Sequence, residues 1–125
     1  MATTLAKLLV VDDEVDIIHS IRKSLVRKGF EVDVYSEPEK ALLEFKPNKY
    51  DLVISDLKMP KMTGYELYFE IKKKDPNAKI IFLTAFEIQS YEFNKICPGL
   101  TVANFVLKPV TMTRLIEAIT AQIKN

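Results

Sequence analysis

Four short runs along the chain are almost wholly apolar, and polar or turn-forming residues bound each of them. They cover residues 8–11, 52–54, 80–83 and 105–107. Short apolar runs without alternation are typical of strands that helices cover on both faces of a sheet. A fifth stretch, 31–35, alternates polar and apolar positions, which predicts a strand with one wetter face at an edge of the sheet.

The segments between these runs carry apolar residues at helical spacing. The expected apolar faces are Ile18, Ile21 and Leu25; Pro38, Ala41, Leu42 and Phe45; Tyr65, Tyr68 and Phe69; and Met112, Leu115, Ile116, Ile119 and Ile123. Gly29 and the Asp75-Pro76 pair predict where the first and third helices end, and Thr111 predicts a cap before the last. A fourth helix is expected from about residue 87 to 96, before Pro98-Gly99.

The order is strand then helix, five times over, which predicts a parallel sheet with helices on both faces. A flavodoxin-like (βα)5 doubly wound five-stranded sheet with strand order 2-1-3-4-5 fits, because it puts the alternating strand at an edge. We therefore expect residues 1–125 to form a single α/β domain, with no output domain in this chain.

Composition narrows the class of protein. The 18 basic and 17 acidic residues nearly balance, which argues against a dedicated nucleic-acid surface and a polybasic membrane anchor. No apolar stretch approaches the roughly 20 residues of a membrane-spanning helix. One cysteine, Cys97, cannot form an intramolecular disulfide, so a cytoplasmic protein is expected. The single histidine, His19, excludes multi-histidine metal sites, and three scattered glycines exclude a dinucleotide fingerprint or a Walker loop.

Polar side chains follow four of the five predicted strands. Asp12 and Asp13 follow the first, Asp56 the third, Thr84 the fourth and Lys108 the fifth. Because sites in open parallel sheets form at the carboxyl ends of the strands, these groups should converge on one rim. Each pair of carboxylates about 4 Å apart would repel by roughly 4 kcal/mol at an effective dielectric constant of about 20.

Such a cluster needs cations. Lys108 supplies one positive charge, and a divalent metal would balance the rest. Ligands that are all oxygen select a hard ion, Mg²⁺ first and then Mn²⁺ or Ca²⁺. A metal and a lysine beside a carboxylate suit phosphoryl transfer, with Asp56 on the central strand as the best nucleophile. The product, an aspartyl phosphate, would attract the Thr84 hydroxyl and shift the loop and surface beyond it.

These residues resemble the receiver domain of two-component response regulators, either stand-alone or cut from a longer regulator. The matching pieces are Val10-Val11-Asp12-Asp13-Glu14, Asp56-Leu57-Lys58-Met59-Pro60 followed by Gly64, Leu83-Thr84-Ala85 and Leu107-Lys108-Pro109. The resemblance covers essentially the whole chain. Any one motif is weak, but all four in order at strand ends make a specific signal.

The resemblance implies a metal site and its chemistry. Asp56 would be the phosphoacceptor and, with Asp12, Asp13 and the backbone carbonyl of Lys58, a ligand of Mg²⁺. The donor would be a phosphohistidine on a sensor histidine kinase or a phosphotransfer protein. The chain would phosphorylate and dephosphorylate itself without being a turnover enzyme.

It also implies a switch. Thr84 would be the switch hydroxyl, Phe105 the switch aromatic, and Lys108 the phosphate-contacting lysine, aimed into the site by a cis bond to Pro109. The surface of the fourth helix, fifth strand and fifth helix would then change its affinity for a protein target. Two departures stand out: the stretch 97–104 lacks the family's usual Gly-Ala-Asp-like turn, and the interval from Thr84 to Lys108 is slightly long.

Alternatives remain at this point. Asp12 and Asp13 could cap the first helix, Thr84 could cap the fourth, and Phe105 could be only a core aromatic. The chain could be a receiver-like interaction module that works without phosphorylation. A hydrolase normally needs a second aspartate where Lys58 stands, and a flavin carrier would meet repulsion between its phosphate and the acidic rim.

Overall fold

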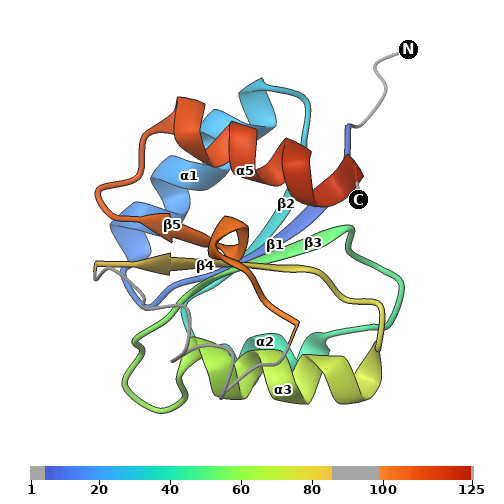
Figure 1. The fold of residues 1–125 in the computed structure, drawn as a ribbon. Helices are drawn as coiled ribbons and strands as arrows, with labels where there is room; N and C mark the ends of the chain where they lie inside the picture. The colour runs from blue at the N-terminus through green and yellow to red at the C-terminus, as the bar shows by residue number, and fades with distance from the viewer. Residues whose placement is uncertain (1–4, 86–98, 125) are drawn as a thin grey trace.

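Five parallel strands form one sheet in the order β2-β1-β3-β4-β5 in the computed structural model, which describes residues 5–85 and 99–124 (Figure 1). The strands are β1 (Lys7–Val11), β2 (Glu31–Tyr35), β3 (Leu52–Asp56), β4 (Ile80–Thr84) and β5 (Phe105–Leu107). The expected fold class is confirmed, and so is the edge position of the alternating strand.

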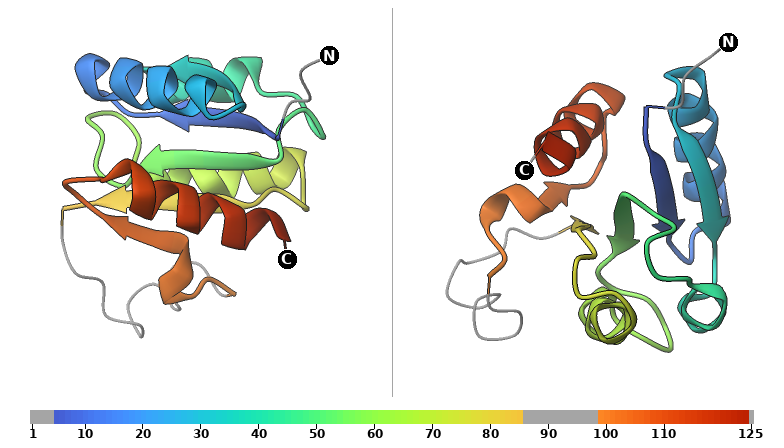
Figure 2. Two further views of the ribbon diagram at one scale, coloured as in Figure 1. Left: turned by 90° about the horizontal axis from the view of Figure 1, so that it is seen from above. Right: turned by 90° about the vertical axis from the view of Figure 1, so that its right-hand side faces the viewer.

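Helices cover both faces of the sheet. They are α1 (Val15–Arg27), α2 (Pro38–Glu44), α3 (Gly64–Lys74) and α5 (Met112–Lys124), and the 3₁₀ helix η1 (Val102–Asn104) precedes β5. The views from different sides agree that α1 and α5 lie on one face, with α2 and α3 on the other (Figure 2). The helix expected at about residues 87–96 lies outside the described residues. None of the helices seen in residues 5–85 and 99–124 has the length and apolar character needed to span a bilayer.

The central strands carry continuous apolar runs because alternate residues enter two separate cores. Leu8 and Val10 of β1 pack with α1 and α5, whereas Leu9 and Val11 pack with α2 and α3. The same alternation divides β4, where Ile81 and Phe82 face opposite cores. Both faces of the central strands are therefore buried, as their sequences indicate.

Local signals set the helix ends. Gly29 has φ +102° and its N–H donates to the Val26 carbonyl, which closes α1 as predicted. The N–H of Asp75 donates to Ile71 at the end of α3, and the Thr111 hydroxyl accepts from the Arg114 N–H at 3.2 Å. These contacts confirm the predicted end of α3 and the cap before α5.

One predicted helix face was partly wrong, and one helix ends just before the last residue of its predicted face. The buried face of α3 carries Leu67, Tyr68 and Ile71, and Phe69 is 45% exposed. Each residue turns the helix by about 100°, so Leu67, Tyr68 and Ile71 lie on one face. Phe69 is two residues after Leu67 and therefore points away from that face. In addition, α2 ends at Glu44, and Phe45 enters the core from the extended segment that follows.

Candidate metal centre

The strand ends bring the predicted groups to one rim of the sheet. Asp56 and Thr84 are the last residues of β3 and β4, and Asp12 and Lys108 directly follow β1 and β5. The parallel register sets these ends side by side, since Val11 pairs with Ser55, Asp56 with Leu83 and Thr84 with Leu107. Four neighbouring strands thus contribute to a single site, as the sequence indicates.

Three carboxylates cluster at this rim. Asp12, Asp13 and Asp56 each present an oxygen, and these oxygens lie within 4.8 Å of one another. Asp12 and Asp56 are buried, whereas Asp13 is exposed. A compact set of oxygen donors that opens to solvent on one side fits Mg²⁺, which binds through a few carboxylates and keeps several waters.

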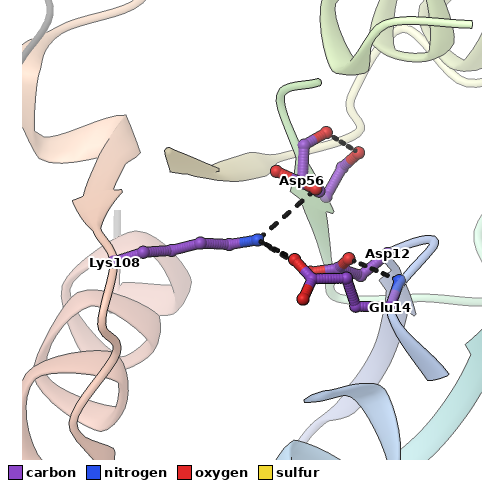
Figure 3. Close-up of polar contacts among 5 residues, drawn as sticks. Asp12, Glu14, Asp56 and Lys108 are labelled. Carbon is purple, nitrogen blue, oxygen red and sulfur yellow. Dashed lines mark hydrogen bonds and ion pairs between the residues drawn. The ribbon is translucent and has the colours of Figure 1, made fainter. Parts of the chain in front are cut away.

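Lys108 extends toward the carboxylates from the segment that follows β5 (Figure 3). Its Nζ lies 3.3 Å from Asp12 Oδ2 and 3.4 Å from Asp56 Oδ2. The same Nζ lies 3.4 Å from Glu14 Oε1. The bond between Lys108 and Pro109 is cis, as the resemblance implies. One ammonium group thus contacts three carboxylates: Asp12 and Glu14 between β1 and α1, and Asp56 at the end of β3.

Burial and mutual repulsion shift the acid groups of the site. Burial is the largest cause that raises the pKa of Asp12 to about 6, and the Asp56 carboxylate adds to it against the Glu14 N–H and Lys108. Burial likewise raises the pKa of Asp56, although Lys108 opposes it. For Lys108 itself, burial lowers the pKa, but the carboxylates of Asp12 and Asp56 raise it more. The charged carboxylates are therefore held at a cost that a cation would relieve.

Thr84 and the loop after β3 complete the rim. A hollow of about 310 Å³ is lined by Asp13, Glu14, Asp56, Leu57, Lys58, Thr84, Ala85 and Lys108. Thr84 is almost fully buried there, and the backbone N–H of Lys58 hydrogen-bonds the Asp56 carboxylate. The other predicted switch residue, Phe105, lies in the core, where its ring centroid is 5.5 Å from that of Phe82.

Gly64 lets helix α3 approach the end of β3 closely. Its N–H donates to the Leu57 carbonyl at 2.8 Å. A Cβ at this position would lie 2.5 Å from the Asp56 carbonyl oxygen and 3.1 Å from Leu57 Cα. Only glycine fits without displacing the backbone that carries Asp56.

Glu14 also belongs to the site, and the sequence does not indicate its contact with Lys108. It is the N-cap residue of α1, and its N–H donates to Asp12 Oδ1 at 3.0 Å. The alternative that Asp12 or Asp13 is the N-cap residue of α1 is therefore wrong. The alternative that Thr84 caps a fourth helix falls on residues outside the described part of the chain.

Known proteins are similar to this chain in sequence. Residues 8–120 match the response regulator receiver domain. The chain is 36% identical over 114 residues to the chemotaxis protein CheY of Bacillus subtilis, and the match covers 90% of this chain and 93% of that protein. It is 30% identical over 124 residues to the transcriptional regulatory protein RprY of Bacteroides fragilis, where the match covers 95% of this chain and 51% of that protein.

A solved structure extends the similarity to three dimensions. The response regulator protein TrrA of Thermotoga maritima, in complex with Mg²⁺ and BeF, has a TM-score of 0.74 with 33% sequence identity. The match covers 94% of this chain and 99% of that one. The similarity in sequence and in fold thus extends over nearly the whole length of this chain.

Proposed function

This chain belongs to the family of response regulator receiver domains, and we propose that it accepts a phosphoryl group on Asp56 in two-component signalling. One observation carries the proposal: the buried Asp56 carboxylate sits within 4.8 Å of two further carboxylates and 3.4 Å from the Lys108 ammonium. The donor we propose is a phosphohistidine on a sensor histidine kinase or a phosphotransfer protein.

The chain's own groups suit this transfer. An oxygen of Asp56 attacks the phosphorus, and the new O–P bond replaces the P–N bond of the phosphohistidine. The imidazole leaves with the electron pair of the broken P–N bond, and it leaves as a neutral ring because its other nitrogen already carries a proton. Lys108 donates to a phosphoryl oxygen, which neutralises charge that builds up in the transition state.

Asp12, Asp13, Asp56 and the Lys58 carbonyl are the proposed ligands of Mg²⁺. When bound, Mg²⁺ would offset the carboxylate repulsion and the negative charge of the phosphoryl group. The acidic cluster of this chain and the Mg²⁺ named for TrrA support this choice over softer metals.

Phosphorylation of Asp56 would change the conformation of neighbouring residues. We propose that the Thr84 hydroxyl turns toward the new phosphoryl group and that Phe105 repacks against Phe82 as a result. The surface that responds would comprise residues 87–96, β5 and α5, and it would bind a protein target. In this scheme the protein is a signalling switch in the cytoplasm rather than a turnover enzyme.

Intact-mass measurement tests the proposal. Wild-type protein is incubated with a small phosphodonor, with and without Mg²⁺, beside an Asp56→Asn variant. One added phosphoryl group is expected only on the wild type with Mg²⁺. If metal binding is measurable but no adduct forms with any donor, the proposal fails, and an interaction module that works without phosphorylation takes its place.

A further inference from the structure

The Lys108 ammonium group contacts a third carboxylate besides those of Asp12 and Asp56. Lys108 and a divalent cation together offset the charges of Asp12, Asp13 and Asp56. Glu14 reaches the same ammonium group, since its Oε1 lies 3.4 Å from Lys108 Nζ. Glu14 therefore adds a negative charge to this rim, which Lys58 also lines.

Glu14 is more exposed than the two buried carboxylates, Asp12 and Asp56. Its side chain is 58% exposed, whereas the side chain of Asp12 is fully buried. It is the N-cap residue of α1, and its side chain lies at the end of Lys108 together with that of Asp12 (Figure 3). Glu14 is thus a group that an incoming ligand meets early, before it reaches the buried carboxylates.

The Glu14–Lys108 pair lies between two hollows. One is the hollow of about 310 Å³ that also holds Asp56 and Thr84. The other, of about 620 Å³, lies beside α1 and the segment after β5, and Glu14 and Lys108 line it as well. A phosphodonor that enters the first hollow must share Lys108 with Glu14 or displace it.

We propose that Glu14 is a positioning and specificity-determining residue: it holds Lys108 at rest and disfavours free, highly charged phosphodonors. This inference rests on the proposed phosphorylation of Asp56. Exposed ion pairs are weak, so the hold on Lys108 is reversible and yields once a phosphoryl oxygen is available. The Glu14 charge repels a donor more strongly the more negative that donor is, and salt screens the effect.

Two small donors of different charge test the inference. At neutral pH acetyl phosphate carries mainly two negative charges, and phosphoramidate, as its zwitterion, carries one net negative charge. In both transfers Asp56 forms the O–P bond, and acetate or ammonia leaves with the electron pair, ammonia taking its proton from the zwitterion. Glu14→Gln is expected to speed phosphorylation by acetyl phosphate about fivefold at low salt, and by phosphoramidate about half as much.

Asp16→Asn is the matched control. Asp16 is exposed in the first turn of the same helix, so the variant loses the same charge near the same helix end. Within residues 5–85 and 99–124, the ion pairs of Lys108 are with Asp12, Glu14 and Asp56, and Asp16 is not among them. The donor preference of Asp16→Asn should match that of the wild type. An equal change in both variants would mean that charge anywhere on the rim is enough, and would overturn the role of Glu14.

A readout without phosphorylation separates the inference from the proposed function. In metal-free protein, the NMR signal of the Lys108 ammonium group should move in Glu14→Gln and stay in place in Asp16→Asn. Glu14→Asp keeps the charge on a shorter side chain, so it should shift the signal but retain most of the donor preference. An unmoved Lys108 signal in Glu14→Gln overturns the inference.

The outcomes also distinguish which idea has failed. If wild type is phosphorylated and Glu14→Gln shows an unchanged donor preference, the inference fails and the proposed function stands. If neither donor phosphorylates the wild type, the proposed function fails and the donor specificity fails with it, while the Lys108 signal still reports whether Glu14 holds the lysine.

Discussion

The buried carboxylate of Asp12 makes the site costly to fold without a cation. Its side chain is fully buried beside Asp56, and Lys108 Nζ at 3.3 Å offers it partial compensation. A raised pKa means that the folded protein resists ionising this group more than the unfolded chain does. The acid cluster therefore lowers the stability of the metal-free fold.

Neutralising Asp12 should stabilise the metal-free protein. Asp12→Asn keeps an oxygen for the Glu14 N–H but removes the buried charge, so we expect the free energy of unfolding at pH 7 to rise by about 1 to 2 kcal/mol. Urea unfolding in the presence of a chelator measures this. In the same variant, added Mg²⁺ should raise the melting temperature much less than it does in wild type. A variant that is less stable than wild type in chelator would contradict the prediction.

The same group predicts how stability depends on pH. The pKa of Asp12 rises from an ordinary value of 3.8 to about 6 in the fold, so between these values the folded state binds more protons than the unfolded state. The contribution of Asp12 to stability therefore falls as pH rises through this window, and its full cost is present above about pH 6. The stability gap between Asp12→Asn and wild type in chelator should widen from about pH 4.5 to about pH 7. A gap that stays constant would contradict this.

At the scale of elements, the start of α3 is fitted to the end of β3. Gly64→Ala would place a methyl group 2.5 Å from the Asp56 carbonyl oxygen, and backbone cannot yield as a flexible side chain does. We expect a loss of about 2 to 3 kcal/mol in unfolding free energy, despite the better helix propensity of alanine. Chemical denaturation measures the loss, and the mass assay should report slower phosphorylation because Asp56 is displaced.

Gly99→Ala is the control for the loss of a glycine. Gly99 has φ +96°, and a Cβ added there would meet no atom of the described chain within 4 Å, so alanine introduces backbone strain alone. A cost of about 1 to 2 kcal/mol is expected, with the phosphorylation rate unchanged. Equal phosphorylation rates in both alanine variants would contradict the role assigned to the close approach at Gly64.

The elements also explain what the sequence could predict. Strands with two buried faces must be apolar at every position, so their runs stand out, and Gly29 and Thr111 mark helix ends by local contacts. The face of α3 was misassigned because Phe69 is as apolar as Leu67, and only the sheet decides which one is buried. Convergence at the rim was predictable from strand direction, whereas the contact between Glu14 and Lys108 depends on side-chain reach between distant segments.

Across the whole molecule, the sheet joins two cores into one unit. Ile81 and Phe82 are neighbours on β4 but belong to opposite cores, so strain on one side is shared through the strand. We expect Ile81→Val and Phe82→Leu each to lower the unfolding free energy by about 1 kcal/mol. Each should shift one common transition when backbone and tyrosine signals are followed together. Separate transitions for the two signals would show that the two cores unfold independently.

The two edge strands of the sheet, β2 and β5, affect whether copies of this protein associate in a concentrated solution. A sheet of this kind ends in a strand with unpaired backbone groups, which invites another chain to add itself as a further strand. On β2, Asp33 is engaged by the Tyr50 hydroxyl at 2.6 Å and by Lys49 at 3.6 Å, and Glu31 is paired with Lys7. At the opposite side β5 has only three residues. Charged residues on one edge strand and the short length of the other discourage strand addition between copies, so the molecules can stay separate in solution.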